Sequence, residues 1–336
     1  MKILRKIPFF LPLLALLPSL TGEQPIRLSY PSYFPKPHYD FSENRLSAEK
    51  IALGRALFYD PILSKDNSIS CASCHSPYNA FAHTDHALSH GIYDSIGLRN
   101  APALMNLAWQ TSFMWDGAIH HLDMQALAPI GSPSEMGADF KHVLQKLRAS
   151  GRYPAWFQDA FGDTAITGER FLKALAQFQL TLVSAGSRYD LMRQGKTVFL
   201  PQEERGYQIF RQSCNPCHTE PLFTNYSFSG HGLLPDPFLQ DAGRYRITQA
   251  PSDSLAFKTP TLRNLRYTYP YMHDGRFKTL RQVLDQWGDS GGAGAHTPAV
   301  LEAGQKADLI AFLRTLNDSA FVFNPDFHFP KALLAN

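Results

Sequence analysis

The sequence predicts a mainly α-helical protein made of two domains. Its 336 residues are enough for two domains of about 100–200 residues each. Apolar residues recur at helical spacing in several segments, and no comparable stretch alternates apolar and polar residues as a half-exposed strand does. The 24 prolines and 22 glycines predict many turns and long loops between these helices.

Five helices are predicted from this spacing. The first begins near Ser47 and ends by Tyr59. The fourth begins at Thr279, which forms a capping box with Gln282, and the last spans roughly residues 302–316. Apolar residues that share one face define the four helices after the first: Phe140, Val143, Leu144 and Leu147; Phe171, Leu175, Phe178 and Leu182; Leu280, Val283, Leu284 and Trp287; and Leu309, Leu313 and Leu316.

Three segments outside these helices have no helical pattern. Residues 23–45 are rich in proline and aromatic residues and are predicted to form an extended arm over the surface. Residues 219–260 lack periodicity and are predicted to form a long loop. Residues 321–336 carry four phenylalanines and are predicted to form a tail packed on the body of the protein.

The N-terminus has the charge pattern of a secretory signal. Residues 1–6 carry three positive charges, an apolar stretch follows from Ile7 to Leu17, and polar residues begin at Thr21. We expect residues 1–22 to be a signal peptide, with an uncleaved anchor as the alternative. The formal net charge is +3, and removing Lys2, Arg5 and Lys6 leaves about zero. A nucleic-acid-binding protein is therefore not expected.

The four cysteines form two copies of one motif. Cys71 and Cys74 precede His75, Cys214 and Cys217 precede His218, and no cysteine lies outside these two Cys-x-x-Cys-His sequences. This is the attachment pattern of haem c, in which two thiols bind the porphyrin and the adjacent histidine binds the iron.

Disulfides, zinc and a redox pair account less well for the four cysteines. An exported protein with four cysteines often has two disulfides, and two Cys-x-x-Cys pairs can form a Cys₄ zinc site. Neither accounts for a histidine directly after each pair, and a thioredoxin-like redox pair would account for one copy only. The sequence therefore predicts two covalent haems, one in a domain over 23–195 and one in a domain over 196–336.

Residues around both motifs add a more specific pattern. The combined order resembles that of the bacterial di-haem cytochrome c peroxidase family, which includes the MauG-type enzymes, over roughly residues 46–316. The matching segments are Leu53-Gly54-Arg55, Arg99-Asn100-Ala101-Pro102, Trp115-Asp116-Gly117, Gln125, Glu135-Met136, Gly243-Arg244, Phe257-Lys258-Thr259-Pro260, Leu262-Arg263-Asn264 and Pro270-Tyr271-Met272-His273-Asp274-Gly275.

The resemblance implies two cytochrome c-like helical domains in the periplasm, each with one haem c. In peroxidases of this family the N-terminal haem reduces hydrogen peroxide, and the C-terminal haem receives electrons from a small cytochrome c or a cupredoxin. Members commonly bind one calcium ion between the domains and often form homodimers.

The resemblance also implies roles for residues of the first half. His75 would be the proximal iron ligand, Glu135 the acid–base residue on the distal side and Gln125 an amide that binds the bound oxygen species. The ordinary alternatives are a surface glutamate and a helix glutamine. His90 resembles the detachable distal ligand that blocks the iron until the other haem is reduced.

Two other histidines compete with His90 for the role of distal ligand, and further positions match residues of the family. His83 and His86 compete with His90, and a solvated loop histidine is the plain alternative. Trp115 matches the tryptophan placed between the haems, although it could simply pack the domain interface. Asn100, with the carbonyls of Thr268 and Pro270, matches the calcium ligands.

The second half departs from the family at one position. His218 would be the proximal ligand, but Trp287 stands where relatives have a distal Met or, in MauG-type proteins, a Tyr. An indole offers no useful lone pair to iron, and Trp287 lies on the apolar face of its predicted helix. Met272, His273 and His296 are alternative ligands, and a five-coordinate iron is a further possibility. Because the axial ligand sets the potential, the electron-entry role of this haem is in doubt.

Three functions are compatible with these observations. The first is peroxide reduction, supported by Glu135 and Gln125 near the first motif. The second is a MauG-like oxidation of residues in a partner protein, which Trp287 weakly favours and His90 disfavours. The third is a non-catalytic di-haem electron carrier, which would leave Glu135 without a purpose.

Overall fold

The computed structural model describes residues 26–230, 232, 234–289 and 300–334, apart from the side chains of residues 287–289. The predicted signal peptide and His296 lie outside these residues. Helices dominate the described chain, as predicted, and none of them is both long and apolar enough to cross a membrane.

The α-helices are α1 (Ala48–Tyr59), α2 (Cys71–Cys74), α3 (Leu122–Gln125), α4 (Leu127–Gly131), α5 (Phe140–Ala149), α6 (Tyr153–Phe161), α7 (Gly168–Leu180), α8 (Arg188–Arg193), α9 (Pro201–Ser213), α10 (Tyr245–Thr248), α11 (Leu280–Asp289), α12 (Ala303–Arg314), α13 (Ser319–Val322) and α14 (Lys331–Leu334). Short 3₁₀ turns span Pro61–Leu63, Pro77–Asn79, Ile92–Asp94, Leu107–Trp109, Pro251–Asp253 and Pro325–Phe327.

The first hydrophobic core forms around the crossing of α1 and α7. Each helix starts at a capping hydroxyl, because Ser47 accepts a hydrogen bond from the Lys50 amide and Thr167 accepts one from the Arg170 amide. At the crossing, a Cβ on Gly54 would overlap the carbonyl oxygen of Ala174, so only glycine permits this approach.

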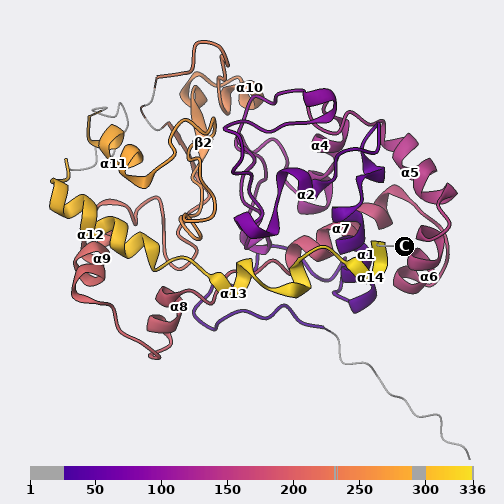
Figure 1. Cartoon of the computed structure of the whole chain (residues 1–336), viewed down its shortest axis with the longest axis horizontal. Coiled ribbons are helices and arrows are strands. Elements are labelled where there is room, and N and C mark those ends of the chain that lie inside the picture. The colour runs from indigo at the N-terminus through magenta and orange to yellow at the C-terminus, as the bar shows by residue number, and fades with distance from the viewer. Residues whose placement is uncertain (1–25, 231, 233, 290–299, 335–336) are drawn as a thin grey trace, which may run out of the picture.

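The second core repeats this arrangement with α9 and α12. A Cβ on Gly206 of α9 would overlap the carbonyl oxygen of Asp308 in α12. Phe210 and Phe312 are buried at this contact, with ring centroids 5.0 Å apart. The two helix pairs therefore form matching cores, which appear on opposite sides of the molecule in Figure 1.

Both ends of the described chain connect the halves. In the arm, Phe34 packs on Trp109 of the first half, while the Tyr33 hydroxyl donates to Asp190 in α8. The tail returns from α12 to the first core, where the Tyr59 hydroxyl donates to the carbonyl of Phe327 at 2.6 Å. Figure 1 shows α14 among the helices of the first half. The predicted tail thus packs on the body, and specifically on the core that contains α1.

Some sequence expectations need correction. Residues 219–260 are not one structureless loop, because they contain α10 and the antiparallel strands β1 (Phe228–Gly230) and β2 (Ala256–Lys258), with Ser229 opposite Phe257. The helix over 302–316 is not the last one, since α13 and α14 follow it. Leu182 and Leu316 are fully buried but lie just beyond the ends of α7 and α12.

We predict that Gly206→Ala lowers the free energy of unfolding by about 1–3 kcal/mol, because the added methyl group forces α9 away from α12. Gly304→Ala is the matched control, since no atom lies within 4 Å of a Cβ at Gly304 in α12. Thermal unfolding of the haem-loaded protein, followed by circular dichroism, checks this. Equal melting temperatures for the two variants would contradict the packing argument.

Candidate haem sites and the cavity between them

The first motif forms one turn of helix followed by its histidine. Cys71 and Cys74 are three residues apart in α2, which places both thiols on one face. The amide of His75 donates to the carbonyl of Cys71 at 2.9 Å, so the histidine closes the turn. Its Nδ1 lies 2.8 Å from the carbonyl oxygen of Phe81 and must be the protonated nitrogen.

The second motif follows the C-terminal end of α9. The Cys214 amide donates to the carbonyl of Phe210, and the His218 amide donates to the carbonyl of Cys214 at 2.9 Å. Nδ1 of His218 lies 3.1 Å from the Pro260 carbonyl and 3.3 Å from the Phe223 carbonyl. This histidine therefore has the same tautomer as His75.

The chemistry of these groups fits haem attachment. Burial lowers the pKa of His75 and of His218 to about 4, so both rings are neutral and keep a lone pair on Nε2. A metal-binding histidine commonly donates its second ring N–H to a carbonyl in this way. Burial also raises the pKa of Cys71 to about 12 and of Cys74 to about 11. Both thiols are therefore protonated at neutral pH and are not thiolates.

Disulfides and a shared zinc site do not match the structure. The four cysteines are free, which is inconsistent with two disulfides. Within the described ranges, no three His, Cys, Asp or Glu side chains gather as metal ligands, so the cysteines do not form a Cys₄ zinc site.

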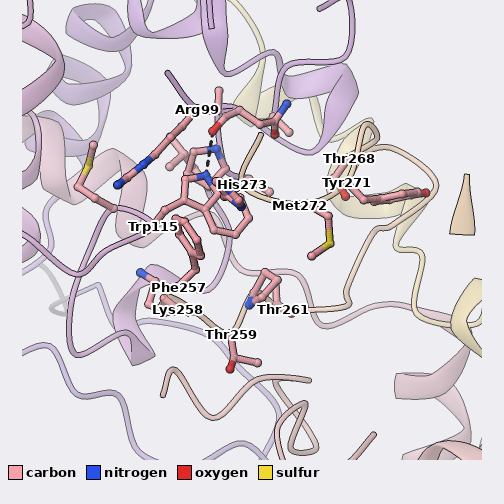
Figure 2. Close-up of a pocket in the computed structure, with 18 of the residues that line it drawn as sticks. Arg99, Trp115, Phe257, Lys258, Thr259, Thr261, Thr268, Tyr271, Met272 and His273 are labelled. Atoms are coloured by element: carbon pink, nitrogen blue, oxygen red, sulfur yellow. Dashed lines mark hydrogen bonds between the residues drawn. The ribbon is translucent and has the colours of Figure 1, made fainter. Parts of the chain in front are cut away.

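One cavity of about 1190 Å³ reaches both motifs. It is larger than the ~300–1,000 Å³ of ordinary small-molecule pockets, as expected of a space for two large groups. Its wall includes all four cysteines and both motif histidines, together with residues from each half. Figure 2 shows part of this wall, where Trp115, Phe257 and His273 form a group.

The predicted acid–base pair faces this cavity. Glu135 and Gln125 both line it, together with His75. Burial raises the pKa of the Glu135 carboxyl, and the charge of Glu135 contributes to the raised pKa of Cys74. Gln125, at the end of α3, directs Nε2 toward the sulfur of Met114 at 3.8 Å.

Trp115 lies where the two halves meet. Its indole N–H donates to the carbonyl of Asn100 at 2.9 Å, and its own carbonyl accepts the Lys258 amide at 2.7 Å. Lys258 belongs to a segment that carries the family resemblance, but its sequence pattern predicted no role for it. Its ammonium donates to the Gln110 side chain and the Ser112 carbonyl, and burial lowers its pKa to about 7.

A cluster of ion pairs connects the two halves next to Trp115. Arg99, from the first half, binds Asp241 of the second half through two hydrogen bonds of 2.6 and 2.8 Å and also binds Asp116. Such bidentate pairs fix orientation as well as adding energy. In the same wall, the rings of Phe257 and His273 stack with centroids 3.7 Å apart.

The residues proposed for calcium all belong to the cavity wall. Asn100, Thr268 and Pro270 all line it, although the first lies far from the others in sequence. The Asn100 side chain donates to the carbonyl of Ala87, and its amide donates to the carbonyl of His273 at 2.7 Å. Asn100 thus links the two halves, and its role as a calcium ligand stays a prediction.

His90 lies beside the first site. Its ring stacks on His86 with centroids 4.0 Å apart, and Nε2 of His83 is 3.3 Å from Nδ1 of His86. The neighbouring Ser89 lines the cavity, and the Cys74 thiol donates to the carbonyl of His90 at 3.4 Å. The gating role of His90 stays a prediction.

The sixth ligand of the second haem stays open. Trp287 is part of α11, as predicted, but its side chain is outside the described part of the structure. Met272 and His273 both line the cavity and remain candidates.

Comparison with known proteins places the chain in a family. The family model of di-haem cytochrome c peroxidases matches residues 48–198. The MauG methylamine utilization protein of Methylorubrum extorquens is 37% identical over 288 residues, which are 81% of this chain and 79% of that protein. The cytochrome c551 peroxidase of Nitrosomonas europaea is 34% identical over 294 residues, covering 84% and 83%.

Solved structures agree with this placement. A MauG-like protein associated with microbial copper homeostasis has a TM-score of 0.82 and 31% identity, covering 91% of this chain and 99% of that one. The di-haem peroxidase BthA of Burkholderia thailandensis has a TM-score of 0.73 and 25% identity, covering 83% and 88%. With both attachment motifs facing one cavity, these matches show that the chain belongs to the di-haem cytochrome c peroxidase and MauG family.

Proposed function

We propose that this protein is an exported peroxidase of the periplasm that reduces hydrogen peroxide to water with electrons from a small cytochrome c or a cupredoxin. The observation that carries the proposal is the shared cavity, in which a half-buried carboxylate, Glu135, lies close enough to Cys74 of the first haem-attachment motif to influence that thiol. The relatives named as cytochrome c peroxidases support this reaction. The charge pattern of residues 1–22 supports export.

The haem-holding residues follow from the motifs. Cys71 and Cys74 would hold the first porphyrin, Cys214 and Cys217 the second, and Nε2 of each adjacent histidine would bind the iron. When bound, the haems supply electrons and an iron position at which the O–O bond is cleaved.

Protons for the reaction would come through Glu135. Its carboxylate takes a proton from one oxygen of peroxide and delivers it to the second oxygen, which leaves as water. One peroxide consumes two electrons and two protons and yields two waters. The Gln125 amide would orient the peroxide, and Trp115 would carry charge across the junction of the halves.

A calcium ion would connect the halves at Asn100. The Asn100 side-chain oxygen and the carbonyls of Thr268 and Pro270 are hard ligands of the kind calcium prefers. Because the Asn100 carbonyl accepts the Trp115 N–H, ion binding at Asn100 would also fix the orientation of Trp115. We also propose a homodimer, which the family resemblance implies.

A second candidate is the oxidation of a partner protein. The relatives named MauG, at 37% and 33% identity, favour this interpretation. Trp287, at the position where the resemblance implies a Tyr in MauG-type proteins, favours it weakly, whereas His90 disfavours it.

We expect the half-reduced protein, loaded with both haems and calcium, to oxidise two equivalents of a reduced small cytochrome c for each peroxide consumed. Stopped-flow absorbance measures both. Absence of donor oxidation with cytochrome c, and with a reduced cupredoxin, would reject the peroxidase proposal. Peroxide consumption that depends on a partner protein and changes its mass would favour the second candidate.

We predict that Glu135→Gln lowers kcat/KM for peroxide by about 10²–10⁴-fold, because the amide cannot accept the transferred proton. Since burial raises the pKa of Glu135, activity of the parent should fall on acidification at a pH above the ordinary glutamate value, as the carboxylate becomes protonated. Steady-state rates across pH check both effects. Glu43→Gln, at an exposed position, is the control and should retain the parental profile.

We predict that His90→Ala allows the fully oxidised protein to react with peroxide without prior reduction, because the blocking ligand is removed. The EPR spectrum of the oxidised protein should gain a high-spin signal. His86→Ala removes the stacking partner but keeps His90, so it should retain the lag before activation. If His90→Ala shows the parental spectrum and lag, the gating assignment is wrong.

A further inference from the structure

Phe81 holds the first histidine through an unusual backbone conformation. Its carbonyl accepts the Nδ1–H of His75 at 2.8 Å and the amide of Leu104 at 3.2 Å. The φ angles are +50° at Ala80 and +61° at Phe81, so two side-chain-bearing residues in succession are left-handed. A bulky residue in this region costs on the order of 1–3 kcal/mol and persists only where its surroundings enforce it.

The surroundings of Phe81 come from the first core and from the C-terminal tail. Its ring is fully buried. Phe58 and Phe178 of the first core have ring centroids 5.8 and 6.3 Å from that of Phe81. Phe321 and Phe327 of the tail have theirs at 5.9 and 6.5 Å.

The tail is itself fixed at this place. Phe321 and Phe327 pack on each other with centroids 5.5 Å apart, and the Tyr59 hydroxyl donates to the Phe327 carbonyl. Arg55 donates to the carbonyl of His328 at 2.7 Å. The contact with Phe81 is therefore part of an anchored segment.

At the second site, a phenylalanine with the same left-handed conformation directs its carbonyl toward the motif histidine, but the tail is not among its neighbours. Phe223 also has a left-handed φ of +57°, and its carbonyl lies 3.3 Å from Nδ1 of His218. Its ring packs on Tyr189, Phe210 and Phe312, which belong to α8, α9 and α12. The described part of the tail packs on Phe81 and not on Phe223.

We propose that Phe321 and Phe327 form a proximal brace, which holds the Phe81 carbonyl against His75 and thereby tunes the first haem. They are positioning residues, and the inference depends on His75 being the iron ligand proposed above. A strong hydrogen bond from Nδ1–H to a carbonyl makes the imidazole a better donor and stabilises the ferric iron. Loosening the brace should therefore raise the reduction potential of the first haem.

The test compares Phe327→Ala with Phe323→Ala in the protein carrying both haems. Phe323 is 56% exposed and belongs to the same tail, so its variant controls for general effects of removing a phenylalanine. We expect Phe327→Ala to shift the ferric–ferrous equilibrium of the first haem about tenfold toward ferrous, which is about 59 mV for one electron. The second haem, measured in the same titration, should not shift.

Two further measurements separate positioning from damage. The iron–histidine stretching frequency of the first haem, measured by resonance Raman, should fall in Phe327→Ala and be restored in Phe327→Leu. If Phe327→Ala does not fold, Tyr59→Phe removes only the hydrogen bond to the tail and should give a smaller shift of the same sign.

Two outcomes would contradict the proposed role of Phe321 and Phe327. An unchanged potential and stretching frequency for the first haem, or an equal shift of both haems, would overturn the brace. Failure of the underlying assignment gives a different result, because a protein without haem at Cys71 and Cys74 shows no signal from the first site at all.

Discussion

The site depends on one hydrogen bond, which occurs twice. In each half, a motif histidine directs its Nδ1–H to main-chain carbonyls, at 2.8 Å to Phe81 for His75 and at 3.1 Å to Pro260 and 3.3 Å to Phe223 for His218. This bond fixes the tautomer and the ring orientation, and it leaves the lone pair on Nε2. At each site a phenylalanine with positive φ contributes a carbonyl, and a buried aromatic cluster maintains that conformation. The large cores thus keep two small backbone turns in place.

The two halves share more than their attachment motifs. Gly54 permits the close crossing of α1 and α7, and Gly206 permits that of α9 and α12. Phe81 and Phe223 have the same backbone conformation and the same contact with a histidine. This repetition is not evident in the sequence, because it consists of single residues whose spacing differs. Phe81 is six residues after its histidine, whereas Phe223 is five after its own.

Much of the helical framework was predictable from the sequence. The Ser47 cap, the box of Thr279 and Gln282, and the apolar faces of α5 and α7 depend on local rules, and the structure confirms them. The strands β1 and β2 were missed because three residues carry no measurable alternation. The contacts of Lys258 with Gln110 and Ser112 and the contact of the tail with Phe81 were missed because they depend on distant segments meeting. The gathering of Glu135, Gln125, Trp115 and Asn100 on one cavity was expected from family resemblance and not from periodicity.

The return of the tail has a consequence for how the molecule matures. Synthesis and export both present the chain from its N-terminus, and domains generally fold in that order. Here the earliest half lacks the rings of Phe321 and Phe327 until synthesis has passed these two residues. The half that is made first is therefore finished last, and a nascent or truncated chain can complete its later cofactor pocket before its earlier one.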